Sequence, residues 1–498
     1  MSDIAIGLWS FPALLFIIFM RIPIGLAMFV TGLVGLVIVT DGTVVPFARL
    51  KSETFTTFSS YSLTIVPLFL LMGHFATLGG MSQALFKAAE GWLGHRKGGV
   101  AMAAVGACAG FGAICGSSIA TAATMGRVAL PELKKYGYTG GFSTATLAAG
   151  GTLGILIPPS VVLVIYAILT EQNIAKLFLA AFIPGLLAAL GYVIVISIYV
   201  RLYPKSAGIR PRVGYAERFK ALAKVWPVLV VFSLVVGGIY LGWFTPTEGA
   251  AVGALGTGVI AYFNGGLSFK TLGESFIVTG KSTAMIFFIV LGASFYNGFL
   301  AITQVPQEIA AFITEQGFNP WLVITIILIF YLLLGCLMDS LSMILLTIPI
   351  FWPVIMGLDF SMVSMAELHA DRATAALAKG VELAPAMLES IQSTLAQGLV
   401  LTQEQISAMG LRGVSEAVLQ RINVEQTAIW FGILVLIVVE VGLITPPVGM
   451  NLFIINAMDR KTPMVDTYKA VIFFVISDLA RVALLTAFPI ITLFLIPW

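Results

Sequence analysis

Most of the chain consists of long apolar runs separated by short polar loops. A helix needs about 20 apolar residues to cross the hydrocarbon core of a bilayer. Runs of this kind occur at 4–20, 22–40, 61–79, 177–202, 225–243, 247–263, 280–302 and 470–496. Two more runs, 143–170 and 428–455, carry a Pro-Pro pair near the middle. The pattern predicts an all-α integral membrane protein with about 10 to 12 transmembrane helices.

The two Pro-Pro pairs end nearly identical motifs that lie 288 residues apart. Residues 154–159 read Gly-Ile-Leu-Ile-Pro-Pro, and residues 442–447 read Gly-Leu-Ile-Thr-Pro-Pro. Proline removes an amide donor and breaks a helix. Within a bilayer, the freed backbone is tolerated only where protein buries it or where it lines a cavity. The motifs predict one broken helix in each half of an internal repeat, with polar ligands bound beside them.

Two other apolar segments are interrupted at their centres by small and polar residues. Residues 99–131 contain Ser117-Ser118 at the interruption, and residues 321–353 contain Asp339-Ser340. Each half is about 13 to 18 residues long, which is short for a full span. Both segments therefore predict re-entrant helical hairpins that turn inside the membrane. We call Ser117-Ser118 the first tip and Asp339-Ser340 the second tip.

The proline spacing sets the two hairpins in register and exposes an insertion. Ser117 to Pro131 and Asp339 to Pro353 are both 14 residues, but the stretch from that proline to the Pro-Pro pair is 66 residues longer in the second half. The additional residues, about 361–425, are rich in Ala, Glu and Gln and have apolar positions at helical spacing. They predict two or three amphipathic helices outside the membrane. Whether these helices dock a partner or are a family-specific decoration stays open.

These features divide the chain into four parts. Residues 1–60 are N-terminal scaffold helices, and residues 61–202 are the first repeat with its hairpin and broken helix. Residues 203–279 hold a cytoplasmic loop and further scaffold helices. Residues 280–498 are the second repeat, with the hairpin, the insertion, the broken helix and a C-terminal helix.

Composition indicates that the chain is a membrane protein, and the placement of its basic residues predicts its orientation across the bilayer. The chain is 59% hydrophobic and 10% charged, with a mean hydropathy of +1.01, against about 25% charged residues in soluble domains. Basic residues collect in loops near 87–97, 134–135, 201–224 and 460–469, which the positive-inside rule places in the cytoplasm. Counting spans from 201–224 makes the first hairpin enter from the cytoplasm and the second from the periplasm, together with the insertion. Such an inverted repeat supports alternating access.

Several function classes are disfavoured. The basic loops lack interleaved aromatic residues, so nucleic-acid binding is not expected. The three cysteines have no metal-ligand spacing and predict free thiols, and the three histidines are scattered. An intramembrane enzyme would need a second carboxylate or a histidine pair beside Asp339, and a channel would need a continuous polar path. We expect no cofactor. The residues concerned are Cys108, Cys115, Cys336, His74, His95 and His369.

At each tip, the ends of short half-helices concentrate partial charge. Carbonyl ends favour cations, and hydroxyl and carbonyl oxygens without a thiolate or imidazole suit an alkali cation such as sodium. Asp339 is a candidate to hold a cation, bind a substrate hydroxyl or titrate. Glu440 is expected to brace the second broken helix through backbone hydrogen bonds. Arg127 either faces an anionic substrate or snorkels toward the cytoplasm, and snorkelling is the slightly preferred expectation.

The motifs around the tips and breaks resemble those of the large membrane subunit of tripartite ATP-independent periplasmic (TRAP) transporters. The similarity covers nearly the whole chain outside the insertion and is carried by residues 115–126, 149–160, 335–339 and 440–451. It implies sodium-driven uptake of an organic acid, such as a C4-dicarboxylate, sialic acid or a keto acid, across the bacterial inner membrane. The motion implied is that of an elevator.

The resemblance also implies partners. A soluble periplasmic protein would capture the substrate and deliver it, and a small four-span membrane subunit would brace the large one. Because no four-span segment precedes Ile4, we expect that subunit as a separate chain. A self-sufficient sodium-dicarboxylate symporter, which needs no binding protein, is the alternative.

Matching positions imply the ligands. The first sodium site would comprise Ser117 and the backbone of Gly154, Ile157 and Pro159, and the second would comprise Gly442, Thr445 and Val448. The substrate would lie between them, against Ser117, Ser118, Asp339 and Ser340. Sodium is the one metal ion expected. The insertion departs from the family pattern and leaves the docking of the binding protein open.

Overall fold

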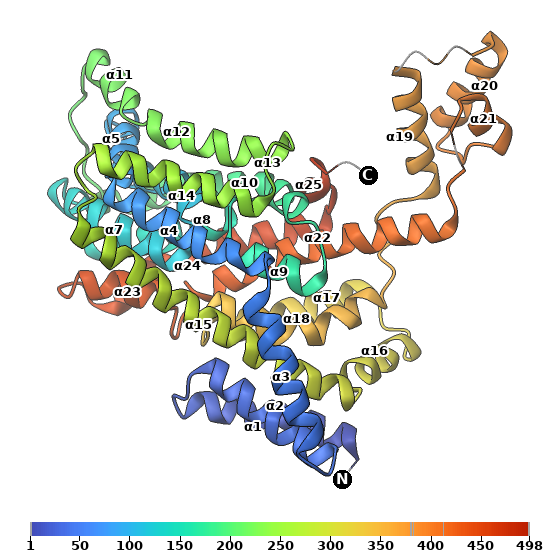
Figure 1. Ribbon diagram of the computed structural model, residues 1–498. Coiled ribbons are helices and arrows are strands. Elements are labelled where there is room, and N and C mark those ends of the chain that lie inside the picture. The colour runs from blue at the N-terminus through green and yellow to red at the C-terminus, as the bar shows by residue number, and fades with distance from the viewer. Residues whose placement is uncertain (1, 379–380, 382, 412, 497–498) are drawn as a thin grey trace.

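We describe the protein from a computed structural model, which covers residues 2–378, 381, 383–411 and 413–496 (Figure 1). Every regular element in this part of the chain is a helix, as the sequence predicts. Among the described residues, four helices are long and apolar enough to cross a membrane alone: α10 (Ile174–Leu202), α15 (Phe269–Ile302), α22 (Glu416–Gly442) and α24 (Met464–Ala487).

Bent helix pairs raise the number of candidate spans to as many as 7. They are α3 (Val44–Ser59) with η1 (Ser62–Thr64) and α4 (Ile65–Leu78), α8 (Gly140–Leu156) with α9 (Val161–Thr170), and α11 (Tyr215–Ala223) with α12 (Trp226–Phe232), η3 (Ser233–Gly237) and α13 (Gly238–Tyr240). The sequence gives a higher number because it also counts shorter elements. The runs at 4–20 and 22–40 correspond to α1 (Asp3–Phe19) and α2 (Ile24–Val39), of 17 and 16 residues.

Both expected hairpins form. The first consists of α6 (Gly99–Cys115) and α7 (Ser118–Lys135), and the second of α17 (Pro320–Gly335) and α18 (Ser340–Met356). Ser117 is the N-cap of α7 and Asp339 is the N-cap of α18, and each side chain accepts a hydrogen bond from the amide three residues on. The two residues thus hold the same structural position, in the register that the proline spacing indicates.

Each hairpin packs beside a broken helix. In the first repeat, α8 and α9 are bent by 44° at the Pro-Pro pair, and α8 packs against both α6 and α7. In the second repeat, α22 is followed after the Pro-Pro pair by α23 (Met450–Met458), and α22 packs against both α17 and α18. The bonds Pro158-Pro159 and Pro446-Pro447 are both cis. The remaining helices are α5 (Met81–Leu93), η2 (Pro204–Ser206), α14 (Pro246–Phe263), α16 (Val305–Glu315) and α25 (Ile490–Leu493).

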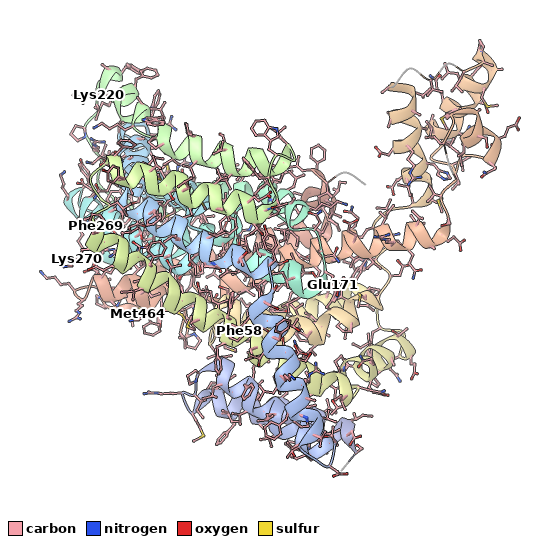
Figure 2. The ribbon with its side chains drawn as sticks, in the orientation of Figure 1. Phe58, Glu171, Lys220, Phe269, Lys270 and Met464 are labelled. Atoms are coloured by element: carbon pink, nitrogen blue, oxygen red, sulfur yellow. The ribbon has the colours of Figure 1, made fainter. Side chains whose placement is uncertain are left out.

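The bases of the two hairpins lie at opposite ends of the molecule (Figure 1). Lys220, Lys270 and Met464 are found toward the left end in Figure 2. The first hairpin's base is tied to that end, because Lys134 forms a 2.8 Å ion pair with Asp459, just before α24. The second hairpin's base lies toward the opposite end, beside α16 and below the insertion (Figure 1).

The insertion forms three helices that stand apart from the main bundle (Figure 1): α19 (Met365–Ala378), α20 (Pro385–Ala396) and α21 (Gln403–Ala408). Ala373, Ile391 and Ile406 are buried in a small apolar cluster separate from the main core. Residues 379, 380, 382 and 412 of the predicted insertion lie outside the described residues. The last part of the predicted insertion, 416–425, forms the first turns of α22, which begins at Glu416.

The two ends of the insertion are joined by one side chain. The Asn423 amide accepts a hydrogen bond from the Val363 N–H at 2.8 Å and donates one to the Val363 carbonyl at 3.0 Å. Val363 and Asn423 are therefore neighbours in space although 60 residues separate them in sequence.

This geometry makes the insertion removable. Replacing residues 364–422 with a short Gly-Ser linker should leave the membrane body folded, because the excised helices bury their apolar residues mainly against one another. We expect thermal unfolding of the detergent-purified variant within a few degrees of the full-length protein and an unchanged response to sodium. The full-length Asn423→Ala variant controls for loss of the two Asn423–Val363 hydrogen bonds alone. Aggregation of the deletion variant beside a well-behaved Asn423→Ala protein would make the insertion part of the core.

Candidate functional site

The first tip lies directly against the first break, which we define as residues 154–160. A Cβ atom added to Gly154 would lie 2.7 Å from the Ser117 carbonyl oxygen, and one added to Gly116 would lie 2.9 Å from the Pro159 carbonyl oxygen. Ile157 ends α8 in an extended conformation. Three of the four residues expected at the first sodium site, Ser117, Gly154 and Pro159, thus have their backbones at or beside the tip–break contact.

In the second repeat the end of α17, just before the second tip, packs against the second break, residues 442–449. A Cβ atom added to Gly442 would lie 2.5 Å from the Cα atom of Gly335, at the end of α17. The Thr445 hydroxyl donates to the Val441 carbonyl at 2.6 Å, which leaves its oxygen lone pairs free to face a cation. The Asn451 N–H donates to the Leu443 carbonyl at 3.1 Å. This bond folds the break into a closed loop that includes Thr445 and Val448.

The two repeats share a glycine pair that brings each hairpin onto its broken helix. Gly112 meets Gly154 in the first, where an added Cβ would lie 2.6 Å from the Gly154 Cα, and Gly335 meets Gly442 in the second. Sequence reasoning gave Gly335 no structural role. A glycine four to five residues before the N-cap of each hairpin's second helix is the signal that would have found it.

Both tips open into one cavity of about 430 Å³. Ser117, Ser118, Asp339 and Ser340 all line it, so the structure brings together the four residues expected at the substrate. The opposite wall is formed by α4 and α15. Asp339 is held at the tip by Ser342, whose N–H donates to Asp339 Oδ2 at 3.1 Å and whose hydroxyl donates to Oδ1 at 2.6 Å.

Comparison with known proteins assigns the chain to a family. A family model described as the DctM component of tripartite ATP-independent periplasmic transporters matches residues 11–491. The chain belongs to this family. Among relatives of the permease, the C4-dicarboxylate TRAP transporter large permease protein DctM of Pseudomonas aeruginosa is 32% identical over 450 residues, which cover 90% of this chain and 89% of that protein.

Two further matches place the permease within a wider group. The sialic acid TRAP transporter large permease protein SiaM of Vibrio cholerae is 30% identical over 343 residues, 68% of this chain and 78% of that protein. The crystal structure of the YdaH transporter of Alcanivorax borkumensis superposes with a TM-score of 0.56 at 13% identity, covering 90% of this chain and 88% of that chain. The likeness to YdaH is one of fold.

Glu440 of the permease links the second broken helix to the second tip. It is 1% exposed, and its Oε1 accepts a hydrogen bond from the Ser340 hydroxyl at 2.9 Å. The expected bracing through backbone hydrogen bonds is therefore wrong, because the contact runs to a side chain 100 residues earlier. Since the Ser340 hydroxyl proton is directed at Glu440, the Ser340 oxygen can meet the cavity as an acceptor.

A second polar network of the permease escaped sequence reasoning. The hydroxyls of Thr152 and Tyr192 lie 2.9 Å apart, and Tyr192 donates to Asp478 Oδ2 at 2.8 Å. Asp478 also forms a 2.8 Å ion pair with Arg481. The network fixes the last turn of α8, two residues before Gly154. The i, i+3 spacing of Asp478 and Arg481 inside an apolar run is the signal that could have revealed it.

Proposed function

We propose that this permease carries out sodium-coupled uptake of an organic acid of the dicarboxylate, sialic acid or keto acid class. The observation that carries the proposal is the single cavity that both tips line. The Pro159 carbonyl oxygen of the first break lies close to Gly116 beside the first tip, and Gly442 of the second break packs on Gly335 just before the second tip. Hard oxygen donors in a small enclosure favour an alkali cation, and an anionic substrate moving with cations lowers the cost of carrying charge into the membrane.

The two sodium sites of the proposal follow the repeat. The first comprises the Ser117 residue with backbone of Gly154, Ile157 and Pro159, and the second comprises Gly442, Thr445 and Val448. Gly335 is added to the second because its backbone contacts Gly442. The substrate rests between them against Ser117, Ser118, Asp339 and Ser340, which all border the cavity.

The transport step is an elevator motion in this proposal. The two hairpins and two broken helices move as one body against a scaffold that includes α1, α2 and α15, and expose the tips to either side in turn. Support comes from hairpins that extend from opposite ends of the molecule (Figure 1) and from the inverted topology that such carriers share.

The proposal also covers location and partners. The multi-pass chain resides in the bacterial inner membrane, receives its substrate from a periplasmic binding protein and pairs with a small four-span membrane subunit. It performs transport and no chemical conversion. The names of the P. aeruginosa and V. cholerae relatives, a C4-dicarboxylate and a sialic acid permease, support the substrate class.

Reconstituted transport tests this function. The permease is placed in proteoliposomes with the small subunit, and accumulation of radiolabelled succinate, pyruvate and N-acetylneuraminate is followed with and without the binding protein, under an inward sodium or potassium gradient. We expect one of these acids to accumulate under the sodium gradient and not under the potassium gradient. This accumulation should require the binding protein. Sodium-driven accumulation by this chain without either partner would establish the self-sufficient symporter instead. Equal accumulation under potassium would overturn sodium coupling.

A further inference from the structure

The cavity extends well beyond the tips, along α7 to Arg127. One stripe of α7 faces it, formed by Ala120, Ala123, Thr124 and Arg127 at the i, i+3, i+4, i+7 spacing of a single helix face. Arg127 lies ten residues after Ser117, which corresponds to about 15 Å along the helix at 1.5 Å per residue. Arg127, for which the sequence favours snorkelling only slightly over facing an anionic substrate, thus lines the inner cavity.

The wall of the cavity opposite Arg127 also carries polar side chains. His74 and Thr77 of α4 and Thr279 and Ser282 of α15 line the same cavity. Its lining also includes the apolar side chains of Leu70, Ile119 and Ile286. The cavity therefore offers polar groups beyond those of the two tips.

The charge of Arg127 is uncompensated within the described residues. None of the ion pairs found there includes Arg127. Asp339, a carboxylate that borders the cavity, belongs to the second tip. A cationic group inside a cleft with low-dielectric walls focuses its field on anions that enter. A guanidinium group also matches the planar, bidentate geometry of a carboxylate.

We propose that Arg127 binds a carboxylate of the transported organic acid and, together with His74, forms an anion site between the tips and the end of the molecule that bears the basic loops. This inference rests on the proposed function. Side chains on a helix lean toward its N-terminus, so Arg127 leans toward the first tip. A substrate is thereby oriented with its hydroxyl or carbonyl groups at the tips and a carboxylate at Arg127, away from Asp339.

Ligand-dependent thermal stability of the purified permease tests the site. Wild type, Arg127→Gln, Arg127→Lys and Lys135→Gln are unfolded in about 150 mM sodium chloride, the physiological ionic strength. Succinate, pyruvate or N-acetylneuraminate is titrated at constant sodium. Succinamide, the uncharged analogue of succinate, is titrated in parallel. Lys135 is the matched control, because it is a cation on the same helix that pairs with Glu132 and does not line the cavity.

At least one acid should stabilise the wild type, while succinamide should not. Arg127→Gln should weaken the apparent affinity for that acid by about tenfold or more, the range of a lost charge-assisted hydrogen bond. The apparent affinity of Arg127→Lys should lie between those of wild type and Arg127→Gln. Lys135→Gln should match wild type. Unchanged affinity in Arg127→Gln, or no stabilisation of wild type by any of the three acids, overturns the inference. Each protein is also compared in sodium and potassium chloride, so that failure of sodium binding, which belongs to the proposed function, is seen separately.

Discussion

Asp339→Asn should reduce sodium-driven uptake by at least about 100-fold and leave the protein folded. The loss follows from removing the carboxylate charge at the second tip, where hydrogen bonds to a charged group contribute about 1.5 to 3 kcal/mol each. Folding is preserved because Asn serves as an N-cap nearly as well as Asp and its carbonyl can still accept from the Ser342 N–H. Initial uptake rates in proteoliposomes and thermal unfolding of the same preparation measure the two effects.

Asp359→Asn supplies the matched control. Asp359 also accepts hydrogen bonds from the N–H and hydroxyl of a nearby serine, Ser361, but it lies in a loop after α18. This control should transport at the wild-type rate. If Asp339→Asn did so too, Asp339 would be a helix cap without a part in transport.

Gly442→Ala should weaken the stabilisation by sodium, because the second site is disturbed, and should lower the melting temperature. The added Cβ would lie 2.5 Å from the Gly335 Cα and 2.6 Å from its carbonyl carbon. Both are backbone atoms that cannot rotate aside, so the second break must move away from α17. Overpacking of this kind costs about 1 to 3 kcal/mol. The displacement would also move apart the oxygen atoms of the second sodium site.

Gly106→Ala tests the same chemical change where space is open. Gly106 lies on α6 of the first hairpin, and no atom lies within 4 Å of an added Cβ. Alanine there should keep or slightly raise stability, because it has the higher helix propensity. An unaltered sodium titration in Gly442→Ala would mean that close contact of Gly335 and Gly442 does not shape the ion site.

Much of this fold is encoded locally, which is why the sequence predicts it well. The hairpin expected at 99–131 forms at 99–135, and the one expected at 321–353 forms at 320–356. Within the insertion, a local Thr402 to Gln405 capping box starts α21. The end of the insertion has no break in secondary structure, because α22 starts with a polar segment from Glu416 that continues into its apolar span.

The finer parts of the site depend on contacts between residues far apart in the chain. Ser340 meets Glu440 across 100 residues, and Tyr192 meets Asp478 across 286. Neither residue type nor spacing identifies such a partner. The sequence leaves Arg127 open between facing an anionic substrate and snorkelling, because its helix position fits either direction, and only the structure shows that it lines the cavity opposite α4 and α15.

The central claim is that the permease has two sodium sites beside the tips. The thermal stability of the purified chain in sodium, potassium and choline chloride tests this claim most directly. A cation that binds only the folded state must stabilise it by RT ln(1 + [L]/Kd). We expect a rise in melting temperature with sodium alone. The rise should be reduced in Thr445→Ala, which loses the hydroxyl oxygen beside the second break, and retained in Thr445→Ser, which keeps it. The same melting temperature in all three salts would contradict sodium binding by this permease.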